Sequence, residues 1–504
     1  MKNNTFLKNF SFSSIIFLII LLLVIISPNQ PHGFEYKMYL IGTWSLIIFP
    51  ITYYFYSSRE KNIFPIVCVL LCYFFLTYFL YFFLDLYFFP EKVEGTFYSH
   101  QNIRVEDKVY NVESIHLLKS LKVLFYGLLS LNFGYLLKIL LEKDSKKSIK
   151  SKYFKIKDIR ELLFITISLS ILTFVFFYII KIHFYISQFS QIRQPLVYMS
   201  TALCTLSFIK IDNLKKYFFL IPVFLFFIVE MLEGSYVFPF MILLFCYFLY
   251  VSISKKFLII PIIILFLIGS FFHSIKYDYR GLNWHQSNID GQVVQTQKNY
   301  IYQLKALLWL SEKKLKKIFS TKNFLSKEIV RDNNIRRLFH SAEALNVVTM
   351  LSPDVIDFWN GYSYKILSTK IVPRIFWKNK PSDLVGNEVG KRYRILSPND
   401  SQTSWNLPVL NEFYANFGFK AVIIGMFFIG FILRFIGGLN LFKIDINSFS
   451  FVIGSVLLFS ITFFEIHLSM LFGAIVQTFI FLILLIICAK FTYSLLEKKI
   501  KKYE

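Results

Sequence analysis

Residues 257–272 read FLIIPIIILFLIGSFF and contain no charged side chain. A second stretch, SIIFLIILLLVII at 14–26, is equally apolar. An α-helix needs about 20 such residues to cross a hydrocarbon core that is about 30 Å thick. Neither stretch alternates as a barrel strand does, and only helices and closed barrels satisfy their backbone in lipid. These stretches therefore predict a helical membrane protein.

The composition of the whole chain agrees with this fold class. Its 504 residues are 56% hydrophobic and 19% aromatic, with a mean hydropathy of +0.54. Ordinary globular domains are only about 45–50% apolar. We therefore expect an all-α polytopic integral membrane protein. About twelve apolar stretches approach the roughly 20 residues that a transmembrane helix needs, so about twelve transmembrane helices are expected. The expected spans lie near 11–28, 38–56, 63–88, 117–141, 161–181, 195–211, 217–232, 236–253, 257–273, 419–437, 447–466 and 468–490.

The short loops carry their positive charge on one side only. Lys and Arg gather in SREKN (58–62), in 143–160, in KIDNLKK (210–216) and in the tail EKKIKKYE. The alternate links, such as 233–235, are nearly free of them. Since cytoplasmic loops carry this excess, both termini are predicted to be cytoplasmic. The net charge of +24 is then partly a topology signal, and no nucleic-acid partner is expected.

This topology divides the chain into four regions. Residues 1–273 hold spans one to nine, 274–418 form one large outer loop, 419–490 hold the last three spans, and 491–504 form a basic cytoplasmic tail. A loop of this length is usually functional or disordered. Helices are expected at 340–351 and at 300–319, where an apolar face would suit the membrane surface. That face comprises Ile301, Leu304, Leu308, Leu315 and Phe319. In 352–361, a Ser, a Pro and a final Gly predict a further short helix.

Five basic residues of the outer loop are candidates for binding an anion. They are Arg280, Arg374, Lys380, Arg392 and Arg394. Arginine binds phosphate with a rigid bidentate fork and lysine binds it as a point charge. Together they suit a diphosphate at the lipid surface, although contacts with lipid headgroups or with solvent would explain each of them singly.

Four other loop residues are candidates for chemistry or for glycan contact. Glu412 precedes span ten, where partial desolvation would suit a general base, and a salt bridge to a nearby arginine is the alternative. His340 shares the loop and is either a second base or a structural side chain. Trp377 either anchors the loop at the interface or stacks on a sugar. Tyr414 lies in NEFYANFG (411–418).

Several kinds of site are not expected. The sequence has no P-loop, no nucleotide-binding fingerprint, no G-x-S-x-G and no H-E-x-x-H motif. Its five cysteines all fall in the predicted spans, so neither disulfides nor a thiolate metal site are expected. We therefore expect neither a cofactor nor a metal.

Two motifs, together with the topology, resemble a known family. PRIFWKNKP (373–381) and NEFYANFGFKAVIIG (411–425), with a dozen spans and one late outer loop, resemble the Wzy-type oligosaccharide repeat-unit polymerases, the bacterial O-antigen polymerases. The residue-level likeness covers about 371–425 only. The resemblance implies a metal-independent membrane glycosyltransferase of the GT-C-like class in the bacterial inner membrane, with the loop in the periplasm.

The resemblance also implies substrates and roles. Donor and acceptor would be undecaprenyl-diphosphate-linked oligosaccharides, and the product an O-antigen, capsule or exopolysaccharide. The five cations would bind the lipid diphosphate, Trp377 and Tyr414 the glycan, and Glu412 or His340 would take the acceptor proton. Membrane lipids and a chain-length regulator are the other expected partners. An O-antigen ligase acting on lipid A core and a lipid-linked oligosaccharide flippase stay open as alternatives.

Overall fold

The computed structural model describes most of the chain, and the statements below concern that part of it. The described residues are 18–27, 33–56, 66–88, 103–105, 108–110, 114–141, 154–181, 190–211, 213–233, 238–254, 259–289, 292–297, 300–320, 339–372, 377, 384–401, 403–439, 444–461 and 466–503.

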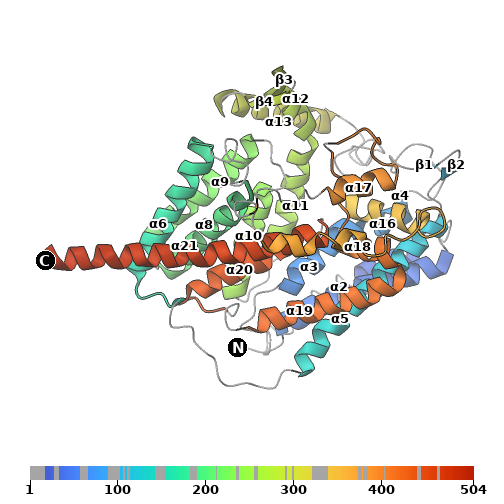
Figure 1. The fold of residues 1–504 in the computed structure, drawn as a ribbon, viewed down its shortest axis with the longest axis horizontal. Coiled ribbons are helices and arrows are strands. Elements are labelled where there is room, and N and C mark those ends of the chain that lie inside the picture. The colour runs from blue at the N-terminus through green and yellow to red at the C-terminus, as the bar shows by residue number, and fades with distance from the viewer. Residues whose placement is uncertain are drawn as a thin grey trace. The chain divides into compact units, whose positions relative to one another are not determined.

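The chain forms two compact units, which are considered separately (Figure 1). Unit 1 consists of Met1–Lys155 and Leu338–Phe481, and unit 2 of Ile156–Arg337 and Leu482–Glu504. The predicted outer loop, 274–418, is thus divided between the units at Arg337 and Leu338.

Unit 1 is built almost wholly from helices. In chain order these are a helix at 18–26, α2 (Gly33–Tyr56), α3 (Ile66–Phe74), the π-helix η2 (Phe75–Phe79), α4 (Leu80–Phe88), α5 (Ser114–Leu141), α16 (His340–Leu351), the 3₁₀ helices η7 (Tyr362–Tyr364) and η8 (Leu367–Ile371), α17 (Val385–Arg392), α18 (Val409–Phe417), α19 (Phe419–Gly438), α20 (Phe449–Ile461) and the first part of α21 (Leu468–Tyr503). The short strands β1 (Ile103–Val105) and β2 (Lys108–Tyr110) form an antiparallel hairpin.

Helices α5 and α19 lie side by side, backbone against backbone (Figure 1). A Cβ atom added at Gly430 would stand 1.9 Å from the carbonyl oxygen of Leu131, and one at Gly134 would stand 2.1 Å from that of Phe427. Only glycine permits this approach, which is how small residues bring helices together in membranes.

The exposed face of α19 is largely apolar, and so is its buried face, apart from the buried Arg434. Val422, Met426 and Leu433 belong to the buried face. On the other face, Ile424 is 57% exposed and Phe428 55% exposed. A helix that is apolar all round belongs in a membrane or in a large core. The exposed apolar side chains are those expected to meet lipid.

Five helices in the described residues are long and apolar enough to cross a membrane. They are Ile66–Leu86, His116–Leu141, Ile159–Ile179, Phe419–Gly438 and Leu468–Lys498. The chain is therefore a helical protein with membrane-spanning character. Helices also lie at the other predicted spans, but the number of crossings and the side of each loop stay predictions.

The expected helix at 352–361 is wrong. Ser352 makes the last hydrogen bond of α16, from its N–H to the carbonyl oxygen of Val348, and its extended backbone angles end the helix. A residue before proline is disfavoured in the helical region, so the same Ser-Pro pair that suggested a helix start is a helix stop. The chain then turns, and Gly361 adopts a φ of 80° before η7.

Unit 2 contains the remaining elements. They are α6 (Ile159–Phe174), the π-helix η4 (Val175–Ile179), α8 (Ser190–Lys210), the 3₁₀ helix η6 (Leu214–Phe219), α9 (Leu220–Leu232), α10 (Phe238–Ser254), α11 (Ile259–Ser274), α12 (Lys276–Asn283), the antiparallel hairpin of β3 (Trp284–Ile289) and β4 (Gln292–Gln297), α13 (Tyr300–Ser320) and the last part of α21. The helices expected at 300–319 and 340–351 are both confirmed, as α13 and α16.

Unit 2 buries three charges together. The Arg193 Nη2 atom lies 2.6 Å from Glu230 Oε1 and also donates to Glu233. The Tyr178 hydroxyl donates to Glu230, and the Tyr300 hydroxyl donates to Glu233 Oε1 at 3.2 Å. The side chains of Glu230 and Glu233 are only 2% and 4% exposed, so the arginine between them offsets their desolvation.

Candidate functional site

The segment that leads into α19 is anchored deep in unit 1. The Asn411 side chain on α18 donates to the Ser341 carbonyl oxygen at 2.8 Å and accepts from the Tyr78 hydroxyl at 2.8 Å. The Asn346 amide on α16 donates to the Tyr81 hydroxyl at 3.0 Å. These bonds fix α16 and α18 against η2 and α4, and give the intervening turns a rigid support.

The turn at 359–363 is built on the end of α18. The N–H of Trp359 donates to the carbonyl oxygen of Ala415 at 2.9 Å, and that of Asn360 to Asn416 at 3.0 Å. The last carbonyl groups of a helix lack partners within it, and here the N–H groups of the neighbouring turn provide them. As a result the indole of Trp359 is held in a defined place.

A chain of buried hydrogen bonds links this turn to Glu412. The Asn416 Oδ1 atom accepts from the N–H of Gly361 at 3.0 Å, and its Nδ2 donates to the Ser363 hydroxyl oxygen at 2.9 Å. The Ser363 hydroxyl in turn donates to Glu412 Oε1 at 2.6 Å. Satisfied buried networks of this kind rigidify the segments that they join.

The second carboxylate oxygen of Glu412 lies at the start of α21. It accepts from the N–H of Leu468 at 2.6 Å. Negative charge is favourable at a helix N-terminus, where N–H groups have no partner within the helix. Glu412 is 1% exposed. The carboxylate predicted as a base is thus bonded through both oxygens within the protein, and its described contacts are those of a positioning residue.

A row of two stacked aromatic rings with a cation at each end lies on the outside of this scaffold. The guanidinium carbon of Arg392 stands 5.8 Å from the ring centroid of Trp359. The Trp359 and Tyr362 rings are stacked at 5.4 Å and 26°, and Lys365 Nζ stands 4.7 Å from the Tyr362 ring. We call these four residues the cation–aromatic ladder.

The ladder is placed to meet a ligand. Tyr362 is 42% exposed, Lys365 is exposed, and Trp359 and Arg392 are half-buried. Aromatic faces attract cations. Each ring of the ladder is stacked on the other ring and has a cation over it. Arginine and lysine bind phosphate oxygens, so the two cations are the groups of the ladder that suit a phosphate.

Arg392 is oriented by the backbone. Its Nη2 atom donates to the carbonyl oxygen of Asp357 at 2.6 Å. Among the described residues its Nε–H has no hydrogen-bond partner, although the atom is buried. Arg394, two residues on, has a φ of 59° and is exposed. Of the predicted cations, Arg392 is the one that the structure places in the ladder.

The other predicted cations lie elsewhere. Arg280 is half-buried on α12 of unit 2, next to Tyr279, whose hydroxyl donates to the Leu232 carbonyl oxygen. Arg374 and Lys380 lie outside the described residues. Trp377 is described and is 38% exposed.

His340 and Tyr414 pack within unit 1. His340 Nε2 lies 3.2 Å from the Asn406 carbonyl oxygen, and its ring meets that of Trp405 edge-on. Tyr414 is 4% exposed, and its hydroxyl lies 3.5 Å from the Ser352 carbonyl oxygen. Burial raises the pKa of Tyr414 to about 12, so this hydroxyl keeps its proton at neutral pH. Its role as a glycan contact stays a prediction.

Sequence reasoning missed three members of the ladder. Trp359, Tyr362 and Lys365 recur every three residues, and this spacing was the available signal. The position of Arg392 opposite Trp359 carries no signal in the sequence, since α17 approaches the turn only in the folded chain.

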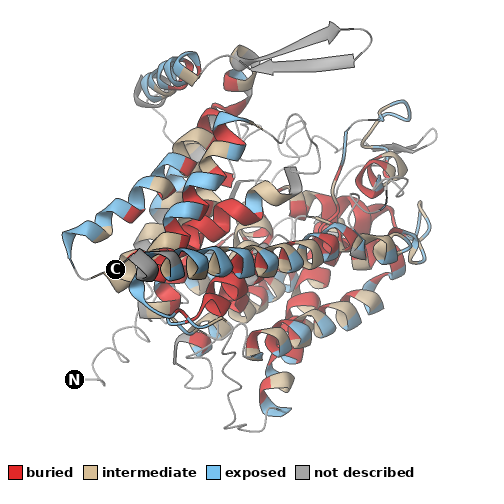
Figure 2. Ribbon diagram, turned by 60° about the vertical axis from the view of Figure 1, so that its left-hand side comes forward, coloured by how far each residue is buried: buried red, intermediate tan, exposed pale blue. Residues whose placement is uncertain are grey.

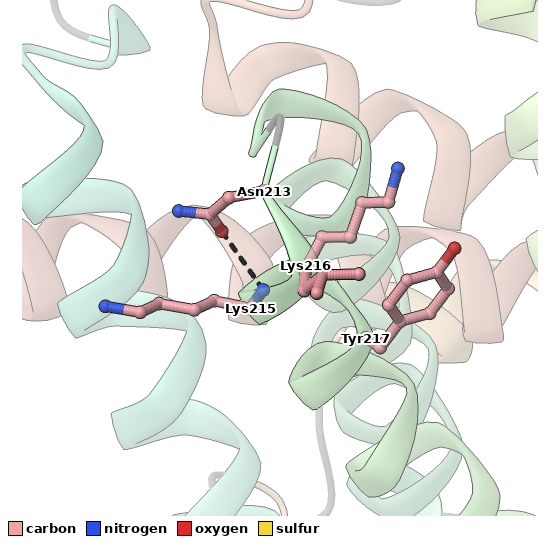
Figure 3. A pocket seen from close by; sticks show the side chains of 5 residues that line it. Asn213, Lys215, Lys216 and Tyr217 are labelled. Atoms are coloured by element: carbon pink, nitrogen blue, oxygen red, sulfur yellow. Dashed lines mark hydrogen bonds between the residues drawn. The ribbon is translucent and has the colours of Figure 1, made fainter.

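A shallow pocket in unit 2 has no comparable set of groups. It lies over η6 and is lined by Asn213, Leu214, Lys215, Lys216 and Tyr217 (Figure 3). The Asn213 Oδ1 atom accepts from the N–H of Lys215 at 3.1 Å and so caps η6. One short segment supplies the whole lining, and we assign no function to it.

Comparison of the chain with protein-family models, with curated proteins and with solved structures gives no match.

Proposed function

We propose that this chain is a membrane glycosyltransferase that polymerises lipid-diphosphate-linked oligosaccharide repeat units into a surface polysaccharide. It would act at the outer face of a bacterial inner membrane. The observation that carries the proposal is the cation–aromatic ladder of Arg392, Trp359, Tyr362 and Lys365. The cations of this row suit the phosphates of a lipid-diphosphate-linked sugar, and its stacked rings hold those cations in place.

The covalent step balances without a cofactor. The bond between the anomeric carbon and the diphosphate oxygen breaks, and the acceptor hydroxyl oxygen forms a new bond to that carbon. The lipid diphosphate leaves with the electron pair of the broken bond, and the acceptor proton passes to a base. Fixed cations at the leaving diphosphate stabilise the charge that develops there. Arg392 and Lys365 take this role in the proposal.

The base that takes the acceptor proton is chosen by comparing the contacts of Glu412 and His340. Glu412 acts as a positioning residue, because its two oxygens are bonded to Ser363 and Leu468. His340 is half-buried at the start of α16. Its Nε2 atom lies 3.2 Å from the Asn406 carbonyl oxygen, which orients the imidazole ring. Histidine is the commonest general base in enzymes, and His340 is the proposed proton acceptor.

Deletion of the gene and complementation with variants tests the proposal. Arg392→Ala should reduce polymer synthesis roughly 100-fold, the order of loss seen when one stabilising donor is removed. Trp359→Ala should also reduce it, because Arg392 loses the ring that it lies over. The readout is the length distribution of surface polysaccharide on gels, with membrane abundance of each variant measured alongside.

Matched controls come from a similar pair in unit 2. Lys216 Nζ stands 5.5 Å from the Tyr217 ring, as Lys365 stands over Tyr362. Lys216→Ala and Tyr217→Ala should leave polymer length unchanged. Unaltered polymer in the Arg392→Ala and Trp359→Ala strains would contradict the proposal. In the deletion strain, single repeats on the lipid A core support a polymerase, a bare core indicates a ligase, and repeats retained on the cytoplasmic face indicate a flippase.

A further inference from the structure

Helix α13 divides its surface into three stripes, and the first of them is buried. Gln303, Ala306, Leu307 and Leu310 are at most 8% exposed. They recur at spacings of three, one and three residues, which is one face of a helix. This face packs on the unit 2 core around Met231, Leu232, Ile275 and Tyr279. The helix is thus docked without using its other two faces.

The second stripe is apolar and exposed. Ile301 is 69% exposed, Leu308 is 61% exposed, and Leu304 and Leu315 are 43% exposed. Their spacings of three, four and seven residues place them on one line along the helix. A soluble surface seldom exposes so many large aliphatic side chains together, and such patches mark an interaction site. These are four of the five residues predicted to form the apolar face.

The third stripe borders the apolar one and is basic. Lys305, Lys313 and Lys316 are exposed along it. Lys313 Nζ stands 5.2 Å from the ring of Trp309, which is itself 54% exposed. The one acid on this helix is Glu312, which pairs with Lys316 at 2.6 Å. The exposed surface therefore keeps a positive excess beside its apolar stripe.

The position of α13 in unit 2 suits a membrane surface. Its buried face contacts Leu232, the last residue of α9, and Ile275, which directly follows α11. Helix α13 packs against α9 and against α12, which directly follows α11 in the chain (Figure 1). Figure 2 shows exposed residues along it. The ends of apolar helices in a membrane protein lie at the lipid–water boundary.

We infer that α13 lies on an anionic phospholipid surface. The stripe of Ile301, Leu304, Leu308 and Leu315 enters the boundary between headgroups and acyl chains, and the lysines contact the lipid phosphates. Apolar burial and attraction to anionic lipid are the two terms that hold such helices in place. The charge beside the apolar stripe selects anionic lipid over a neutral apolar partner. This inference does not depend on the proposed function.

Spin labels on the full chain in single-copy nanodiscs test the inference. One label replaces Leu308 (Leu308→Cys) and a second replaces Lys316 (Lys316→Cys), both in a Cys488→Ser background, since Cys488 is exposed. Collision rates with oxygen and with a water-soluble nickel chelate report the depth of each label. With anionic lipid, the Leu308 label should favour oxygen and the Lys316 label should favour the chelate.

Zwitterionic nanodiscs and a variant that lacks two of the lysines separate the contribution of apolar burial from that of attraction to anionic lipid. The Leu308 label should lie shallower in zwitterionic lipid, and Lys305→Gln with Lys313→Gln should produce the same shift in anionic lipid. Equal depth in both lipids would overturn the choice of anionic lipid. Chelate access at Leu308 in both lipids would overturn membrane binding, as would protection that arises only when another protein is added. Dipolar broadening in larger, multi-copy discs would instead place a second chain on this face and overturn the inference.

Discussion

The carboxylate of Glu412 accepts hydrogen bonds from the Ser363 hydroxyl and from the N–H of Leu468 while it is 1% exposed. Glu412→Ala should lower the free energy of unfolding by about 1–3 kcal/mol, because it leaves a buried donor without a partner. Glu412→Gln should keep more of the stability than Glu412→Ala, since the amide oxygen can still accept from the N–H of Leu468, although the Ser363 hydroxyl would lose its acceptor. Thermal unfolding in detergent measures both.

The same pair of variants separates position from chemistry. Glutamine preserves the shape of the side chain but is not a base. If Glu412 positions the turn, Glu412→Gln should make polymer of normal length. A stable Glu412→Gln protein that makes no polymer would show that the carboxylate itself takes part in proton transfer.

The candidate residues differ in how far their surroundings were predictable. Arg392 and His340 were found from their residue types in an outer loop. Their neighbours, Asp357 and Asn406, follow from chain folding that local patterns do not encode. Glu412 was expected at a membrane border with an arginine as its alternative partner. In the structure it accepts hydrogen bonds from a serine 49 positions earlier and from a backbone N–H 56 positions later.

At the scale of elements, the contact of α5 with α19 depends on Gly430. The Cβ of an alanine there would stand 1.9 Å from the Leu131 carbonyl oxygen, so the two helices would have to separate. Gly430→Ala should therefore destabilise the protein by about 1–3 kcal/mol, as overpacking does.

Gly269 on α11 provides the matched control. A Cβ there would meet Phe240 at an ordinary 3.4 Å. Gly269→Ala should be neutral or slightly stabilising, because alanine favours helix over glycine by about 1 kcal/mol. The midpoints of thermal unfolding compare the two variants. Equal midpoints would mean that the helices adjust without cost.

Elements were predictable where apolar runs are long. The runs at 117–141 and 419–437 correspond to α5 and α19 within a few residues. The short, mixed segments were harder. Ser352 and Pro353 fit a helix start by composition, but Ser352 is the C-cap of α16 and has the extended backbone angles that a residue before proline favours. Whether a Ser-Pro pair starts or ends a helix therefore depends on whether the residues before it already form one.

For the molecule as a whole, the orientation of its loops is a prediction from charge. A membrane-impermeant maleimide should label Asn399→Cys in intact spheroplasts, because 274–418 is expected outside. It should label Lys215→Cys only after permeabilisation. Both positions are exposed, so reactivity reports sidedness rather than burial. Labelling of Lys215→Cys in intact cells would reverse the topology, and with it the face at which the proposed reaction occurs.

The buried triad of Arg193, Glu230 and Glu233 has a consequence for how this sequence can change. Loss of the arginine would leave two desolvated carboxylates without their cation, and loss of one glutamate would alter the charge balance around the others. Removing one partner of a buried ion pair is costly, whereas replacing the whole set by apolar residues is often tolerated. Each single substitution in the triad therefore gives a less stable protein. We therefore expect the three residues to change together during evolution, since an exchange that preserves stability requires at least two substitutions.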